Sequence, residues 1–329
     1  NAPGVFTQLI TQVLEGFEGF STGYIDDILV FSESLSDHLN HLDMIFQRLR
    51  QHGLKLKLKK CSFLQPEMSY LGYRVTNYGL KPEDDKVKAI RELGPPTSKK
   101  EIRSFIGSCS YYRKFLPNFS GIAKPLIDLT KKNTRFKWEE SHARAFEYLK
   151  ESLTMIPFLA FPDASKPYVL YCDASDLCIG ACLTQQTDEG EEVPVYFISH
   201  KLSDTQKRWS TIEKEAYAIF YAVQKLDYLL YGSQFTIKTD HQPLIYLLNS
   251  PSNNKKVQNW MLQLAAYNCT IQHIKGTDNT IVDMLSRAPT SGDTLEPMTE
   301  PEIEVPDQTY HIQTLNSGKF EPKQFASFA

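Results

Sequence analysis

The chain has 329 residues, 41% of them hydrophobic and 12% aromatic, which is enough for more than one domain with a buried core. The net charge of −3 excludes a protein that is strongly basic throughout, and no apolar run approaches the roughly 18 residues of a membrane-spanning helix. None of the six cysteines forms a Cys-x-x-Cys pair, which argues against a zinc site and favours a reducing compartment. The sequence therefore predicts an intracellular, cytoplasmic protein without a membrane partner.

Charge is spread unevenly along the chain. Residues 97–137 contain ten lysines and arginines against two acids, a local charge of +8, whereas residues 289–329 contain seven acids and two lysines, a local charge of −5. The basic block predicts contact with a phosphate backbone, although a solvated helical surface would carry the same pattern. The acidic segment has scattered prolines and no apolar periodicity, so we expect a disordered tail.

Two adjacent acids interrupt an apolar run near the start of the chain. A helix is expected at residues 5–17, and the run at 21–31 contains Asp26 and Asp27. Neighbouring residues on a strand point to opposite faces, so both acids can serve one site only if they lie at a hairpin turn. The alternative is an ordinary turn between two core strands.

Helix and strand signals follow as far as residue 165. An amphipathic helix is expected at 35–52, and strict Leu/Lys alternation at 54–59 predicts a half-exposed strand with a basic face. Ser98 and Glu101 form a capping box that predicts a helix start in the basic block. The remaining expected elements are a hairpin turning at 77–79 and helices near 122–129 and 140–153.

Four acids lie far apart after residue 166, each beside a strand or helix signal. Asp173 and Asp240 follow strand-like apolar runs, Glu215 lies within a helical pattern, and Asp283 opens a short segment. Carboxylates brought to one point can hold two divalent cations about 3.5–4 Å apart, which activate a water and stabilise the leaving oxygen of a phosphodiester. Mg²⁺ prefers such oxygen ligands, and Mn²⁺ is the alternative. Each acid taken alone could instead be a turn or cap residue.

The helix that carries Glu215 can be placed by geometry. Apolar residues recur every three or four positions from Ile212 to Leu230, and Glu215 lies roughly 60° from the centre of this stripe at about 100° per residue. Glu213 lies about 100° away on the other side. A carboxylate beside a core-facing stripe is costly unless it is paired or bound to metal. Glu215 is therefore the ligand candidate, and Glu213 is expected in solvent. The other elements expected after residue 166 are strands at 168–172, 178–185, 193–199, 235–239 and 269–274, and helices near 243–248 and 257–265.

These motifs, in this order, resemble the ribonuclease H domain of gypsy-class LTR-retrotransposon polyproteins. The matching segments are CDAS at 172–175, IGACL at 179–183, EKE at 213–215, TDH at 239–241 and VDMLSR at 282–287. Such elements more often have Ala where Met284 stands, which weakens the last match. The resemblance implies a mixed sheet flanked by helices that cuts the RNA of RNA–DNA hybrids with two Mg²⁺ ions. The catalytic, metal-binding acids that it implies are Asp173, Glu215, Asp240 and Asp283.

The start of the chain resembles the palm of gypsy-class reverse transcriptases at residues 1–6 and at the Tyr-Ile-Asp-Asp stretch ending in Asp27. The resemblance implies that Asp26 is the main ligand and Asp27 the secondary ligand of two Mg²⁺ ions used for nucleotide addition. A third Asp normally comes from an earlier strand. The sequence begins after that strand, at Asn1, and we interpret it as a fragment. We therefore expect this chain alone to lack normal polymerase activity.

The 68–81 hairpin and the basic block resemble the parts of the same enzymes that hold nucleic acid. The hairpin resembles the element that grips the primer end, although core packing also explains its Tyr73. The basic block resembles the thumb, whose phosphate contacts are salt-dependent and blind to sequence. The nucleic-acid contacts predicted in these two regions are Tyr73, Arg74, Lys99, Lys100, Arg103, Arg113 and Lys114.

The predicted architecture combines α/β and α+β parts. It comprises a partial reverse-transcriptase palm at 1–93, a helical thumb at 94–135, a connection at 136–165, a ribonuclease H-like mixed sheet with flanking helices at 166–288, and a disordered acidic, Pro-rich tail at 289–329.

The leading hypothesis is an enzyme: part of an RNA-directed DNA polymerase that carries an active ribonuclease H. Its implied partners are an RNA–DNA hybrid, a primer–template duplex and the rest of a polyprotein, with fingers upstream and an integrase downstream. Its implied location is the cytoplasm, including virus-like particles. Two alternatives stay open. One is an inactive relic or host-adopted module that binds duplexes without cutting, and the other is a structural subunit that supports a complete reverse transcriptase in a dimer.

Overall fold

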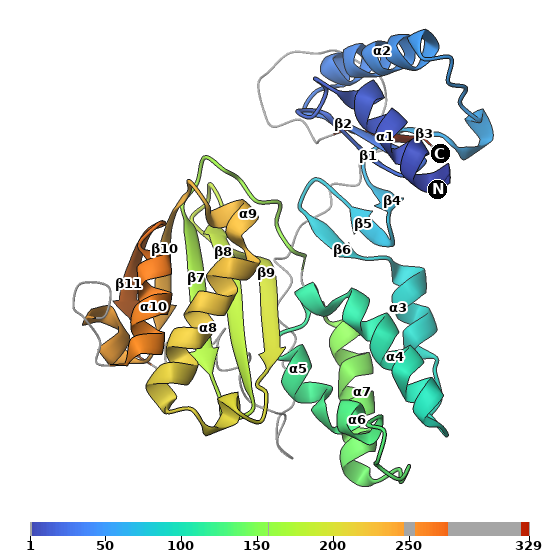
Figure 1. Ribbon diagram of the computed structural model, residues 1–329. Helices are drawn as coiled ribbons and strands as arrows, with labels where there is room; N and C mark the ends of the chain where they lie inside the picture. Colours follow the sequence, from blue (N-terminus) through green and yellow to red (C-terminus); the bar gives the residue numbers. More distant parts are fainter. Residues whose placement is uncertain (1, 157, 247–253, 276–323, 329) are drawn as a thin grey trace. The chain divides into compact units, whose positions relative to one another are not determined.

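The computed structural model describes residues 2–156, 158–246, 254–275 and 324–328, which fall into two compact units (Figure 1). One unit comprises Asn1–Glu83 with Pro301–Ala329, and the other comprises Asp84–Glu300. Within the described ranges, no helix combines the length and apolar character needed to cross a membrane. The finer division into palm, thumb, connection and nuclease stays a prediction from the sequence.

The first unit packs two helices and a hairpin around one apolar core. Ile10, Val30 and Ile45 meet in this core, each no more than 4% exposed. Tyr24 pairs with Asp27 across the hairpin, so the chain reverses between them. The elements are α1 (Ala2–Leu14), β1 (Ser21–Tyr24), β2 (Asp27–Ser32) and α2 (Leu35–Gln51).

Two small sheets complete this unit. The first has the order β1-β2-β12-β3, and the second has the order β4-β5-β6. The hairpin predicted at 77–79 is confirmed, since Thr76 N donates to Gly79 O between β5 and β6. Strand β12 differs from the disorder predicted for the tail, most of which lies outside the described residues. The strands are β3 (Ser62–Gln65), β4 (Met68–Tyr70), β5 (Tyr73–Val75), β6 (Leu80–Pro82) and β12 (Gln324–Phe328).

The strand predicted at 54–59 is wrong. Residues 54–57 form no ladder, and a short 3-10 helix, η1 (Leu58–Lys60), follows them. Leu54 and Leu56 nevertheless pack half-buried against the core, while the intervening lysines are exposed. The alternation therefore correctly indicates an extended segment with one buried and one exposed side. It does not show whether another strand lies beside the segment to form a sheet.

Helices form the first part of the second unit. Ser98 starts α4 by accepting a hydrogen bond from Glu101 N at 3.3 Å, which confirms the predicted helix start. The Glu101 carboxylate accepts from Thr97 N rather than from Ser98 N. Phe105 and Phe146 pack with ring centroids 4.4 Å apart in the helical core. The elements are α3 (Asp84–Arg91), α4 (Lys99–Tyr111), η2 (Arg113–Phe115), α5 (Phe119–Ile122), α6 (Lys124–Leu129) and α7 (Glu140–Thr154).

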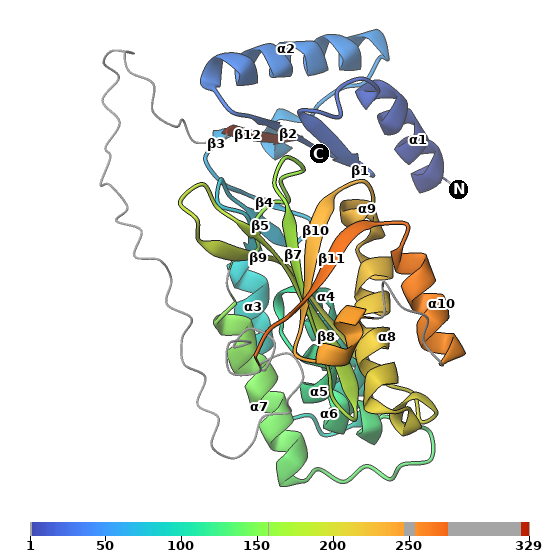
Figure 2. The same cartoon turned by 90° about the vertical axis from the view of Figure 1, so that its left-hand side faces the viewer.

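A five-stranded mixed sheet forms the rest of the second unit, as predicted. Its order is β11-β10-β7-β8-β9, with β7, β8 and β9 antiparallel and β10 and β11 parallel to β7. Helices α8 and α10 cover one face and share its apolar core (Figures 1 and 2). The strands are β7 (Tyr168–Ala174), β8 (Cys178–Gln186), β9 (Glu192–Lys201), β10 (Gln234–Thr239) and β11 (Asn268–His273).

The helices of this part differ from expectation at one place. Helix α8 (Thr211–Lys225) carries Glu215, and α10 (Lys255–Leu264) matches the helix predicted at 257–265. The helix predicted at 243–248 is instead a 3-10 turn, η4 (Gln242–Tyr246), as far as the described residues extend. The short elements η3 (Gln206–Arg208) and α9 (Asp227–Leu230) flank α8.

Candidate metal centre

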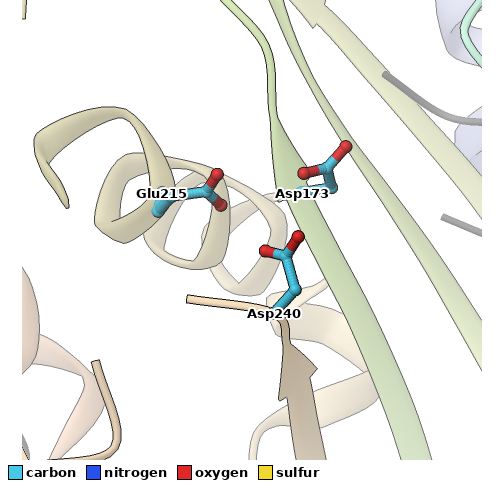
Figure 3. Close-up of side chains that lie close together, drawn as sticks. All are labelled: Asp173, Glu215 and Asp240. Carbon is cyan, nitrogen blue, oxygen red and sulfur yellow. The ribbon is translucent and has the colours of Figure 1, made fainter. Parts of the chain in front are cut away.

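Three of the four acids predicted after residue 166 come together at one point. Asp173, Glu215 and Asp240 each offer a carboxylate oxygen, and these oxygens lie within 4.8 Å of one another. Figure 3 shows the three carboxylates turned toward a common space, Asp173 from β7, Glu215 from α8 and Asp240 from the end of β10. Asp283, the fourth predicted ligand, lies outside the described residues.

The strand register explains how the two aspartates meet. Strands β7 and β10 run parallel, with Lys238 beside Tyr171. The same register, two residues farther on, places Asp240 beside Asp173. The carboxyl ends of parallel strands meet at one edge of a sheet, so both side chains leave from that edge.

Helix α8 brings Glu215 to the same edge. Ala216 and Ile219 of this helix are fully buried in the core that it shares with the sheet, which fixes the rotation of the helix about its axis. Glu215 itself is only 4% exposed. The prediction that it lies beside the apolar stripe and points to the acid cluster agrees with this geometry.

Glu215 is buried where a negative charge is costly. Its Oε2 has no hydrogen-bond partner in the described part of the chain. Burial first, and then the charges of Asp173 and Asp240, raise the pKa of Glu215 to about 9, against the opposing effect of a hydrogen bond from the Ala174 backbone. A buried carboxylate beside two others is costly unless a proton or a bound cation neutralises its charge. The donor set, all carboxylate oxygen, fits hard divalent ions such as Mg²⁺ or Mn²⁺.

Glu213 has a different role from its neighbour, and the expectation that it lies in solvent is wrong. Its carboxylate accepts hydrogen bonds from Ser210 N at 2.9 Å and Ser210 Oγ at 3.0 Å, which completes a capping box at the start of α8. Lys256 of α10 lies 3.2 Å away, and the side chain of Glu213 is 13% exposed. Hydrogen bonding, first from Asn254 and then from Ser210 and Lys256, lowers the pKa of Glu213 to about 2 despite partial burial.

The predicted palm motif lies at a hairpin turn, the geometry that a shared site requires. Asp26 is in the turn and Asp27 begins β2. Burial and the neighbouring Asp26 raise the pKa of Asp27, while Lys60 opposes the shift. Burial, and secondarily the charge of Asp27, raises the pKa of Tyr70 to about 12. Asp26 and Asp27 therefore share one electrostatic environment inside the first unit.

The predicted primer-end contacts lie on β5 of the small sheet. Tyr73 pairs with Tyr70 on β4 and is half-buried. Arg74 forms an ion pair with Glu67, and both side chains remain about one-third exposed, at 34% and 40%. Packing thus covers part of the Tyr73 surface that a nucleic-acid contact would need, whereas the side chain of Arg74 stays partly accessible.

The predicted thumb contacts divide into two groups. Lys99 and Arg103 donate to the carbonyls of Lys131 and Thr130, at 2.6 and 2.9 Å, where α6 ends. Cations are favoured at that position because the last carbonyls of a helix lack partners. Lys100, by contrast, is exposed on the same helix, α4.

Arg113 and Lys114 both make contacts within the protein, although Arg113 is exposed and Lys114 is half-buried. The guanidinium of Arg113 donates to Ser199 O at 2.6 Å. Lys114 lies 5.2 Å from the ring centroid of Phe115, and burial lowers the pKa of Lys114.

Tyr171 and Lys238, which lie beside the acids, were missed in the sequence. Lys238 donates to the Tyr171 hydroxyl at 3.0 Å, and that hydroxyl donates to Glu192 at 3.0 Å. His273 lies 3.1 Å from the carbonyl oxygen of Asp240. Tyr171 and Lys238 each stand two positions before a predicted acid, and the strand period of two was the signal that could have identified them.

Two family models match separate parts of the chain. The reverse transcriptase (RNA-dependent DNA polymerase) family matches residues 1–75. The RNase H-like domain found in reverse transcriptase matches residues 163–267, the region that contains the three clustered acids.

Several curated proteins are similar over most of the chain. The retrovirus-related Pol polyprotein from transposon 297 of Drosophila melanogaster is 42% identical over 289 residues, 87% of this chain and 27% of that protein. The Pol polyprotein from transposon opus of the same organism is 39% identical over 88% of this chain and 30% of its own length. The transposon Tf2-3 polyprotein of Schizosaccharomyces pombe is 35% identical over 87% and 22%. The chain thus spans less than a third of the length of these relatives.

Solved structures of a foamy viral protease–reverse transcriptase have a similar fold. The structure in complex with an RNA/DNA hybrid has a TM-score of 0.72 and 26% identity, covering 92% of this chain and 41% of that chain. The structure in complex with double-stranded DNA has a TM-score of 0.73 and 26% identity, covering 84% and 59%.

Proposed function

We infer that this chain, which belongs to the reverse transcriptase and ribonuclease H segment of LTR-retrotransposon Pol polyproteins, cuts the RNA strand of RNA–DNA hybrids. The convergence of Asp173, Glu215 and Asp240 on a ribonuclease H-like sheet carries this proposal. The substrate class is supported by the similar foamy viral protein, which has been solved in complex with an RNA/DNA hybrid.

The three carboxylates would hold a pair of Mg²⁺ ions, with Asp283 as a fourth ligand. Bound at such a site, the two ions activate a water and stabilise the leaving oxygen of the phosphodiester. Asp173 and Asp240 present oxygens from adjacent strand ends, so the rigid sheet sets their spacing. Glu215 holds a proton at neutral pH because its pKa is about 9, and it releases this proton when a cation binds.

The first unit would contribute to a polymerase site of the longer Pol protein. Asp26 and Asp27 lie at a hairpin turn, where both can reach one pair of Mg²⁺ ions. A primer–template duplex is the proposed partner of this site, with Arg74 as the accessible cation nearby in sequence. The activity of the whole polyprotein, including DNA synthesis, is part of this proposal.

A hybrid-cleavage assay on the full chain tests the nuclease. With Mg²⁺ and a hybrid labelled on the RNA strand, we expect cleavage by the parent and a loss of at least about 10³-fold in Asp173→Asn and Asp240→Asn. Asp188→Asn, at a carboxylate 68% exposed in the turn after β8, is the matched control and should cut at the parent rate. Equal activity in all four proteins would sink the assignment.

The binding-module hypothesis predicts a different pattern in the same assay. Tight hybrid binding by the parent, without cleavage in Mg²⁺ or Mn²⁺, would favour it. The unpartnered Oε2 of the buried Glu215 argues for the enzyme instead, because a module that only grips duplexes has no need of this costly group.

A further inference from the structure

The guanidinium of Arg113 contacts residues of the second unit itself. Its Nη2 donates to Ser199 O at 2.6 Å and lies 3.3 Å from Ser120 Oγ. The guanidinium carbon also lies 5.3 Å from the ring centroid of Phe119. Since β9 is an edge strand, Ser199 O is a backbone acceptor on the open side of the sheet. Arg113 therefore joins the helical part of the unit to the sheet.

Two more contacts lie along the same edge. Ser120 N donates to Ser199 Oγ at 2.8 Å, with both residues no more than 6% exposed. Lys201 Nζ lies 2.8 Å from Asp128 Oδ1, and these two side chains are 25% and 33% exposed. The buried contact at Ser199 is the stronger constraint, because an unmade hydrogen bond there would leave a buried amide unsatisfied. Residues 113–128, within the predicted thumb, are thus fixed to β9.

The point of attachment lies on the same cross-strand row as the metal centre. Ser199 on β9 pairs with Gly180 on β8, and Gly180 pairs with Asp173 on β7. Adjacent strands lie about 4.8 Å apart, so roughly 10 Å of hydrogen-bonded ladder separates Ser199 from Asp173. Because the strands of such a ladder are hydrogen-bonded to one another, the distance between Ser199 and Asp173 is held nearly constant.

We propose that Arg113 and Ser199 are positioning residues that fix the offset between the stretch of duplex held by the predicted thumb and the phosphodiester cut at the metal centre. The inference rests on the proposed function. A duplex held at the basic block then presents the same phosphodiesters to Asp173 in every encounter. The first cuts should fall at a fixed distance from the end of the hybrid.

A phosphate contact by Arg113 predicts the opposite result. Loss of one such contact lowers affinity and reduces the slope of log K against log salt by about 0.9, without moving the cut. Loss of a positioning contact moves or spreads the cuts and leaves that slope unchanged. The two roles can therefore be separated in one set of variants.

The experiment maps first cuts in an end-labelled hybrid with one recessed end. For Arg113→Gln we expect cuts spread over several phosphodiesters, an unchanged salt slope, and the parent rate on a hybrid too short to reach the basic block. Lys201→Met, which breaks only the part-exposed ion pair, should spread the cuts less. Lys100→Gln, at an exposed position, is the matched control and should reduce the salt slope without moving the cuts. Melting curves report whether each variant folds.

Sharp cuts at the parent positions in Arg113→Gln would overturn the inference, whether or not the salt slope falls. A parent that cuts no hybrid would overturn the proposed function instead. In that case the hydroxyl-radical footprint of the bound hybrid tests the positioning role without any cleavage by the protein. Sharp footprint ends in the parent and blurred ends in Arg113→Gln support it, and identical footprints contradict it.

Discussion

The two acidic sites of the chain are built in opposite ways. Asp26 and Asp27 are neighbours in sequence and lie at one hairpin turn of the first unit. Asp173, Glu215 and Asp240 come from two strands and a helix of the second unit, and 67 residues separate the first from the last. The first site is local, whereas the second exists only when the sheet and helix α8 have packed.

The difference lies in the cost of each site to the folded state. The hairpin pair is not deeply buried: partial burial, and then the charge of Asp26, raise the pKa of Asp27, and Lys60 opposes this shift. The dispersed site buries Glu215 with one oxygen unpartnered. The local pair therefore costs the folded state little free energy. The dispersed site destabilises the metal-free protein in a pH-dependent way that unfolding experiments can measure.

Glu215→Gln should give the largest effects. We expect cleavage to fall by at least about 10³-fold because a metal ligand is lost. Without metal the variant should be more stable than the parent. Folded Glu215 keeps its proton up to about pH 9, while the unfolded chain releases it near pH 4.5, so the parent loses stability as pH rises between these values. The gain should reach a few kcal/mol, measured by urea unfolding in EDTA at about pH 8.

The hairpin supplies the matched control for this variant. Asp27→Asn also removes one predicted ligand, but its side chain is not deeply buried. It should leave hybrid cleavage at the parent rate and change metal-free stability much less than Glu215→Gln does. A metal-free Glu215→Gln protein that is less stable than the parent at about pH 8 would contradict the cost assigned to the buried carboxylate.

Metal-linked stabilisation should follow the same division. Mg²⁺ at about 100 times its dissociation constant should stabilise the parent by about 2.7 kcal/mol for one site. The gain should increase with pH toward 9, since binding must displace the proton of Glu215. It should shrink in Glu215→Gln and persist in Asp27→Asn. Calorimetry of unfolding with and without Mg²⁺ measures it, and a pH-independent gain would exclude Glu215 as a ligand.

Glu213, two residues before Glu215 on the same helix, tests the contrast between a capping carboxylate and a metal ligand. Glu213→Ala removes the reciprocal cap at Ser210 and the contact with Lys256, so we expect a loss of about 1 kcal/mol in unfolding free energy with cleavage retained. The lowered pKa makes this contribution complete above pH 4.5, and it disappears as pH falls toward about 2. Urea titrations of parent and variant should therefore converge in acid. A cleavage defect as large as that of Glu215→Gln would show that the two glutamates share one role.

The residues that the sequence placed correctly are those whose role is set within one element or by strand order. Asp173 and Asp240 were identified because each follows a strand-like apolar run, and helix periodicity separated Glu215 from Glu213. The error at Glu213 has a physical reason: its partners Asn254 and Lys256 lie at the start of α10, and helical rotation alone says nothing of a second helix.

Long-range pairing explains the other differences. The segment at 54–59 has the two-sided pattern of a strand but no neighbouring strand to pair with, and β12 enters a sheet whose other strands lie more than 250 residues earlier. Arg113 carries the charge of a phosphate contact, yet its acceptor on Ser199 is 86 residues away. The sequence shows that a cation is present, but the hydrogen-bond acceptor that it reaches depends on the fold.

His38 should give the smallest effect, with the opposite pH dependence to Glu215. It is fully buried in the first unit, 3.1 Å from Ser32 Oγ, and its Nε2 has no partner among the described residues. Burial, and then the nearby His41, lowers the pKa of His38, so the unfolded chain binds a proton first as pH falls below about 6.5. The first unit should thus become less stable in mild acid, whereas the metal-free second unit becomes less stable toward alkaline pH.

Hydrogen exchange of the α2 amides between about pH 7 and pH 5 measures the acid dependence of the first unit. His38→Gln should remove the acid dependence, while His52→Gln, at an exposed position, should retain it. An acid dependence that survives in His38→Gln would assign it to another group.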